Sequence, residues 1–300
     1  MTKIILFGIA LLSLNYCTSP INVDKEFEVH AHRGGRGLMP ENTIPAFLKA
    51  AEMGVVIEMD VVITKDYRVL VSHHPWFDGD ISLDSQGNSI AAEDFSRHNI
   101  FRMRYAETQS YDVGMKPHPR FPEQQRIPAK KPLFEDAVKA IENEAAKKGY
   151  KTPRYNIDIR FRSEQEAIFL PSPQEFGQLI VEAINKAGIK NRMLISSYSE
   201  VMLHIIKDLE PQIPLALLVE TDFPPEENID FLGFVPAVYS PDYKLVDEAL
   251  VTFCKEQNMK LIPWTVNEKE DMKALIELGV DGLITDYPDR LKALLKELNK

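Results

Sequence analysis

The first quarter of the chain concentrates side chains that can carry acid–base and metal chemistry. His32 and Arg33 come first, Glu58 and Asp60 follow, and His73 lies a short distance beyond them. Histidine is the side chain best suited to exchange protons near neutral pH, and arginine can bind phosphate oxygens bidentately. These residues therefore predict a site that moves protons and neutralises the charge of a phosphate group.

Three acidic residues predict a cation site. Glu58 and Asp60 are two residues apart in an apolar run, so on a strand both side chains point to one face. Asp158 lies in a similar run that we expect to form the next barrel strand. Buried carboxylates repel one another unless a cation lies between them, and oxygen ligands suit Mg²⁺ or Ca²⁺. We therefore expect these acids to bind one of the two ions; ion pairs with Arg33 and Arg160 are the alternative.

Alternating apolar runs and helical patterns predict the scaffold. Eight runs have the character of buried parallel strands, over residues 27–32, 55–61, 155–159, 193–197, 215–219, 237–240, 261–266 and 282–285. Helical patterns cover 43–53 and 133–148, and others begin at the capping residues Ser172, Ser199 and Asn267. Eight strand–helix repeats predict an α/β fold, a (β/α)8 TIM barrel, with a doubly wound sheet as the alternative.

The barrel hypothesis places the chemistry at one end. Active sites of such barrels lie at the carboxyl ends of the strands. His32 ends the first run and His73 follows a hairpin after the second, so both are expected there, with Arg33 and Arg160 as phosphate contacts. A zinc site built on His30 and His32 is a weaker alternative, because later strands offer no further histidines.

An insertion is expected over residues 76–131, after the second strand region. This segment has few apolar runs and is much longer than an ordinary connection. Its basic residues are Arg97, Arg102, Arg104, Lys116, Arg120, Arg126, Lys130 and Lys131. They form either a solvated charged face or a basic cap that draws an anionic substrate to the barrel mouth.

Charge and cysteine content narrow the class of protein. The formal net charge is -10, so the chain gains little from counterion release and is not expected to bind nucleic acid. Its 2 cysteines, Cys17 and Cys254, rule out a disulfide scaffold. Cys254 lies in an apolar helical pattern and is expected to be a buried thiol.

The N-terminus has the pattern of an export signal. Lys3 precedes an apolar run over 4–14 that is too short to span a bilayer, and Cys17 follows it. Residues 1–17 therefore predict a lipoprotein signal acylated at Cys17, which would make this a periplasmic or cell-surface protein anchored to a membrane. An ordinarily cleaved signal and an uncleaved anchor are the alternatives.

Several motifs in a fixed order resemble those of the glycerophosphodiester phosphodiesterases. They are Ala-His-Arg-Gly at 31–34, Pro-Glu-Asn-Thr at 40–43, Glu-x-Asp-Val at 58–61, Thr-Lys-Asp at 64–66, His73, Trp-Thr-Val-Asn at 264–267 and the segment 279–288. The resemblance runs from about residue 28 to 292, within a barrel region of 27–300. It implies a barrel enzyme that acts on a small-molecule substrate. The enzyme would hydrolyse glycerophosphodiesters to glycerol phosphate and an alcohol.

The resemblance also implies roles for individual residues. His32 and His73 would be the acid–base pair, Arg33 a phosphate contact, and Trp264 a further substrate contact. Glu58, Asp60 and Asp158 would hold the metal ion.

This chain departs from the usual family pattern at three positions. His74 stands where the family commonly has Asp, and Asp158 and Arg160 stand where Glu and Lys are common. The shorter ligand at Asp158 is expected to change metal preference. Two functional alternatives stay open: a phospholipase D-like lyase that yields a cyclic phosphate, and a non-catalytic lipoprotein that binds glycerophospho compounds.

Overall fold

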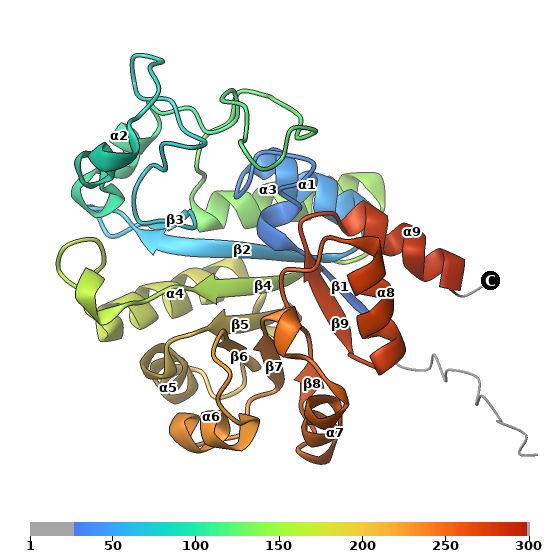
Figure 1. The fold of residues 1–300 in the computed structure, drawn as a ribbon. Helices are drawn as coiled ribbons and strands as arrows, with labels where there is room; N and C mark the ends of the chain where they lie inside the picture. The colour runs from blue at the N-terminus through green and yellow to red at the C-terminus, as the bar shows by residue number, and fades with distance from the viewer. Residues whose placement is uncertain (1–26, 299–300) are drawn as a thin grey trace, which may run out of the picture.

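Eight parallel strands form the centre of the molecule (Figure 1). The computed structural model describes residues 27–298, and the strands follow the order β8-β7-β6-β5-β4-β2-β1-β9. They are β1 (Glu28–Ala31), β2 (Val56–Ile63), β4 (Arg154–Ile159), β5 (Met193–Ser197), β6 (Leu215–Val219), β7 (Val238–Pro241), β8 (Lys260–Leu261) and β9 (Gly282–Thr285). Each strand falls on one of the eight predicted runs. The prediction of a (β/α)8 barrel is therefore confirmed.

Backbone hydrogen bonds between the end of β8 and the β9 segment close the barrel. The Asp281 N–H donates to the Leu261 carbonyl at 2.9 Å, and the Ile284 N–H donates to the Pro263 carbonyl at 3.0 Å. The prediction of a continuous strand over 261–266 is nevertheless wrong, because β8 ends at Leu261. Pro263 has no N–H to donate, so the ladder towards β9 cannot continue regularly through it.

Helices surround the barrel (Figure 1). They are α1 (Ile44–Met53), α3 (Phe134–Lys148), α4 (Pro173–Ala187), α5 (Glu200–Leu209), α6 (Pro225–Leu232), α7 (Glu248–Glu256), α8 (Lys269–Leu278) and α9 (Pro288–Leu298). The Thr43 hydroxyl caps α1 at its start, and Gly54 ends it in the left-handed conformation, with φ of 67°. Cys254 is buried in α7, as predicted. Across residues 27–298, the helices lack the length and apolar composition needed to cross a membrane.

The prediction that Asn267 caps a helix is wrong. The N-cap of α8 is Glu268. The Asn267 side chain instead donates to the Asp286 carboxylate at 2.8 Å and accepts from the Asp286 N–H at 3.0 Å. This partner follows the neighbouring strand β9, 19 positions along the chain, so a local capping pattern could not reveal it.

The region between β2 and α3 departs from the regular alternation. The short strand β3 (Val69–Val71) pairs antiparallel with β2 and forms the expected hairpin. Beyond it, residues 72–133 contain the 3-10 helices η2 (Ala92–His98) and η3 (Ile100–Arg102) and the short helix α2 (Tyr105–Thr108). Figure 1 shows α2 and the surrounding loops above the carboxyl end of β2. The segment has its own apolar cluster, so it is folded structure beside the barrel mouth.

Hydrogen bonds join this segment to the loop after β4. The Asn99 amide donates to the Ile168 carbonyl at 2.7 Å, and the Arg102 guanidinium donates to the Ala167 carbonyl at 2.9 Å. Within the segment itself, the Lys130 ammonium donates to the Tyr111 carbonyl at 2.6 Å. Arg102 and Lys130 therefore bind the protein's own backbone, which weakens the hypothesis of an open basic cap.

Candidate active site

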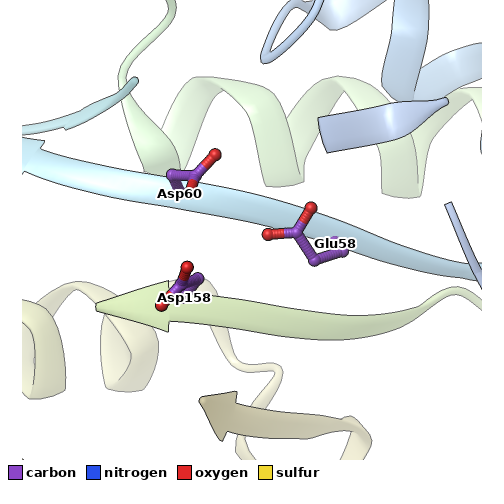
Figure 2. Close-up of side chains that lie close together, drawn as sticks. All are labelled: Glu58, Asp60 and Asp158. Carbon is purple, nitrogen blue, oxygen red and sulfur yellow. The ribbon is translucent and has the colours of Figure 1, made fainter. Parts of the chain in front are cut away.

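Three carboxylates from two neighbouring strands meet inside the barrel (Figure 2). Asp60 on β2 pairs in register with Asp158 on β4, and Glu58 lies two residues before Asp60 on the same face of β2. Ligand oxygens of the three residues lie within 4.8 Å of one another, and all three residues are buried. The structure therefore brings together the acids that the sequence singled out.

The electrostatics of this trio fit a divalent cation. Burial and the neighbouring Asp60 raise the pKa of Glu58 well above its usual range and raise that of Asp158 to about 8. Oδ1 of Asp158 is buried and has no hydrogen-bond partner. A cation would satisfy this oxygen and remove the repulsion among the carboxylates, and an all-oxygen donor set suits Mg²⁺ or Ca²⁺.

The loop between β1 and α1 fixes the carboxylates and adds a buried guanidinium. Arg33 adopts the left-handed conformation, with φ of 51°, and its backbone N–H donates to the Glu58 carboxylate. Its side chain donates to Glu41 at 2.8 Å and lies 3.4 Å from Asp60. The Asn42 amide donates to Asp60 at 2.7 Å. The Pro-Glu-Asn-Thr motif thus positions both Asp60, a candidate metal ligand, and the Arg33 guanidinium.

His32 is held by a carboxylate at the end of the last barrel strand. Its Nδ1 lies 2.6 Å from Oδ1 of Asp286, which follows β9. Asp286 also accepts from Arg36 at 2.7 Å and from Asn267 at 2.8 Å. Burial and the charge of Arg36 lower the pKa of His32 to about 4, so the ring is neutral at pH 7. With Nδ1 donating to Asp286, Nε2 is left free to accept a proton.

His73 directly follows the β2–β3 hairpin and contacts Arg160. A guanidinium N–H of Arg160 donates to Nε2 of His73, whereas Nδ1 of His73 is buried without a partner. Burial and nearby arginines lower the pKa of His73 well below its usual range. The His74 ring packs edge-on against His73, with ring centroids 4.3 Å apart, and stacks on Trp76, with ring centroids 4.8 Å apart. His73 is therefore the histidine of this pair that lies against an arginine of the site.

A pocket of about 130 Å³ joins these groups. The residues that line it include His32, Arg33, Glu58, Asp158, Arg160, Tyr198 and Trp264. The indole N–H of Trp264 donates to the Ser240 carbonyl at 2.7 Å, which fixes this ring at the wall of the pocket. His73 borders this pocket through its hydrogen bond to Arg160. The pocket thus combines groups that could bind an anion, exchange protons and bind a cation.

The zinc alternative finds no support in the described residues. His30 hydrogen-bonds to Glu28 at 3.2 Å and to Asn156 at 3.3 Å, and it lines a different pocket from His32. Within residues 27–298, the one group of three or more potential metal-binding side chains is the carboxylate trio.

Sequence reasoning missed several residues that complete this site. Asp286 lies in the C-terminal motif, and Glu41 and Asn42 lie in the Pro-Glu-Asn-Thr motif, but none was given a role. Lys131 was expected to be one of the exposed basic residues, and this is wrong: it is 4% exposed. Its burial depends on packing across the hairpin, which a charge pattern cannot show.

The fold and the site define a class of protein. A (β/α)8 barrel with acids, histidines and arginines at the carboxyl ends of its strands is typical of barrel enzymes, and this donor set suits phosphate esters. Comparison with known proteins specifies the class further. The model of the "Glycerophosphoryl diester phosphodiesterase family" matches residues 32–290. This chain belongs to that family and is a phosphodiesterase.

Individual relatives agree with this assignment. A glycerophosphodiester phosphodiesterase of Caldanaerobacter subterraneus is 30% identical over 270 residues, which cover 90% of this chain and 98% of the relative. A phosphodiesterase structure from Oleispira antarctica has a TM-score of 0.71 at 20% identity and covers 90% of this chain and 96% of its own. A glycerophosphodiester phosphodiesterase structure from Parabacteroides distasonis has a TM-score of 0.66 at 22% identity, with 91% and 98% covered. The two structures support the fold.

Proposed function

We propose that this enzyme hydrolyses glycerophosphodiesters with the aid of a divalent cation held by Glu58, Asp60 and Asp158. The observation that carries the proposal is the buried carboxylate trio with its unpartnered Asp158 oxygen. Two of the three acids, Glu58 and Asp158, line the pocket that His32 and Arg33 also line. Similarity to a protein named glycerophosphodiester phosphodiesterase supports the substrate class. A further support is that the Oleispira antarctica structure contains the product sn-glycerol-3-phosphate.

The arginines and the cation site would both bind the phosphate group of the substrate. When bound, Mg²⁺ or Ca²⁺ would supply positive charge that stabilises the phosphate in the transition state. Arg33 and Arg160 both line the pocket, so both can donate to phosphate oxygens. In the overall reaction the phosphorus–oxygen bond to the alcohol breaks, and an oxygen from water bonds to phosphorus. One proton passes to the departing alcohol.

The two histidines divide the proton transfers. His32 is neutral and its free Nε2 accepts the proton of the nucleophile, while Asp286 holds the ring and stabilises its positive charge. His73 donates a proton to the departing alcohol. Because an Arg160 N–H donates to Nε2 of His73, this nitrogen carries no proton in the free enzyme. The phosphate must draw Arg160 away, and Nε2 must then take up a proton from solvent, before His73 can donate that proton to the departing alcohol. Substrate binding would then free the nitrogen that has to exchange the proton.

The product distinguishes hydrolysis from the lyase alternative. We expect phosphorus NMR of glycerophosphocholine with the purified enzyme to show glycerol phosphate as the end product. A panel of glycerophosphodiesters with different head groups then defines the preference. Accumulation of a cyclic phosphate that is never opened would support the lyase reaction. Binding of these compounds without turnover of any of them would contradict the proposal and favour the non-catalytic protein.

We also propose that the mature protein is an exported lipoprotein anchored to a membrane through Cys17. Residues 1–26 lie outside the described part of the structure, so this proposal rests on the apolar run and the cysteine that follows it. We expect mass spectrometry of the protein made in a bacterial host to find a diacylglycerol-modified N-terminal Cys17. Cys17→Ser should move the protein to the soluble fraction, whereas Cys254→Ser, at a buried thiol, should not. An intact Met1 or a free terminus beyond Cys17 would contradict the proposal.

A further inference from the structure

Antiparallel pairing places a lysine directly beside the turn that carries His73. Leu70 of β3 pairs with Leu133, and the Val71 N–H donates to the Pro132 carbonyl at 2.9 Å. Because antiparallel partners run in opposite directions along the chain, the next pair in this register is Ser72 with Lys131. The Lys131 ammonium indeed donates to the Ser72 hydroxyl at 2.8 Å.

This lysine is buried at a cost to stability. It is 4% exposed, and Nζ lies 5.6 Å from the centre of the Phe77 ring. Burial lowers its pKa to about 8, although the carboxylates of Glu41, Asp78 and Asp60 oppose the shift. Taking an ammonium group out of water is unfavourable, and an apolar side chain of similar volume often stabilises such a position. Fold stability alone therefore does not account for a lysine here.

The hydroxyl that Lys131 contacts closes the turn around His73. Ser72 Oγ donates to the His74 carbonyl at 2.6 Å, and the Ser72 N–H donates to the Asp60 carbonyl at 3.0 Å. Because an ammonium group can only donate, Lys131 occupies a lone pair of the hydroxyl and directs its hydrogen towards His74. The contact thus fixes the residues on both sides of His73.

The His73 ring has few side-chain contacts, and one of them belongs to its own turn: the ring packs edge-on against His74, with ring centroids 4.3 Å apart. Nδ1 of His73 has no hydrogen-bond partner, and Nε2 has the Arg160 N–H. When phosphate draws Arg160 away, as the proposed mechanism requires, no hydrogen bond of the described structure would hold the ring. The Ser72–His74 turn then has to keep the imidazole at the reacting oxygen.

We infer that Lys131 is a positioning residue for His73, acting through the Ser72 hydroxyl and the His74 carbonyl. The inference rests on the proposed role of His73 in phosphodiester hydrolysis. The Lys131 ammonium donates to the Ser72 hydroxyl, and Lys131 does not line the pocket. Its effect should therefore appear in the chemical step and not in substrate binding.

The test compares two adjacent lysines. We expect Lys131→Met to lower kcat for glycerophosphocholine about tenfold, since small displacements of a reacting group cost one to two orders of magnitude. KM should stay within about twofold, and the Tm should be unchanged or higher because the buried charge is gone. Lys130→Met is the matched control, because Lys130 is exposed and binds the Tyr111 carbonyl. Its kcat and KM should equal those of the wild type.

Ser72→Ala provides a second variant that removes the contact without changing a charge. It should lower kcat by a similar factor, and the double variant with Lys131→Met should show no further fall, because the two residues act as one unit. The inference would be overturned if the double variant lowered kcat by the product of the two single effects. It would also be overturned if Ser72→Ala left kcat unchanged. A fall in kcat matched by a fall in Tm would show a purely structural role, and a raised KM with normal kcat would show substrate contact.

Three further outcomes separate this inference from the proposed function. A wild-type enzyme that turns over no glycerophosphodiester overturns both. An active wild type in which His73→Ala is silent overturns the role of His73 and, with it, that of Lys131. A damaging His73→Ala beside a silent Lys131→Met overturns the inference alone and leaves the proposed function standing.

Discussion

We expect His32→Ala to lower kcat by a factor of about 10² to 10⁴, the range typical of losing a general acid or base. Asp286→Asn should approach the same loss although it leaves the shape of the site intact. The reason is that Nδ1 of His32 lies 2.6 Å from the Asp286 carboxylate, which selects the tautomer with a free Nε2. An amide can present its own N–H to Nδ1 and stabilise the opposite tautomer. Steady-state kinetics on glycerophosphocholine, with Tm measured beside them, check this expectation.

His73→Ala should cause a loss of similar size, and His204→Ala serves as the control. His204 lies on α5 and packs edge-on against Phe234, outside the pocket. Near-normal turnover in His32→Ala would remove that residue from the mechanism. If His74→Ala is severely damaging while His73→Ala is nearly silent, the assignment of the second histidine is wrong by one position.

The second large effect is expected at the carboxylate trio. Asp60→Asn and Asp158→Asn should each lower kcat/KM about 10²-fold or more, because a bound cation contributes several kcal/mol of charge stabilisation in the transition state. Calorimetry should also show weaker binding of Mg²⁺ and Ca²⁺ to both variants. Asp230→Asn on α6 is a matched control, since Asp230 is exposed and lies away from the trio.

A stability measurement separates metal binding from a purely structural role of the acids. In chelator, Asp158→Asn should have a Tm equal to or above the wild type, because one of the mutually repelling buried charges is removed. Added Mg²⁺ or Ca²⁺ should raise the Tm of the wild type and not that of the variant. Metal binding of wild-type strength in Asp158→Asn would exclude this residue as a ligand. Asp158→Glu tests whether the shorter side chain sets the preference between the ions.

The sequence predicted the parts of the molecule that depend on local patterns. Alternating apolar runs and helix signals are short-range features, so the barrel strands and most helices could be placed. Glu58 and Asp60 share a face because they are two apart on one strand, and Asp158 joins them because β2 and β4 are neighbours. This part of the site therefore follows from the fold class itself.

The rest depends on contacts between distant segments. Asp286 reaches His32 across 254 positions of the chain, and the same carboxylate takes Asn267 away from its expected role as a helix cap. The sequence places Lys131 among the basic residues of the expected insertion. An exposed side chain is predicted there because lysine is rarely buried without a partner. The pairing of residues 131–133 with β3, which brings Lys131 to Ser72 across 59 positions of the chain, is visible only in three dimensions.

The dependence of hydrolysis on a metal ion tests the central claim most directly. The purified enzyme is stripped of metal, the residual content is checked by elemental analysis, and the turnover of glycerophosphocholine is followed by phosphorus NMR. The carboxylate trio predicts that turnover stops in the stripped enzyme and returns when Mg²⁺ or Ca²⁺ is added. Full turnover in a sample free of metal would contradict the account.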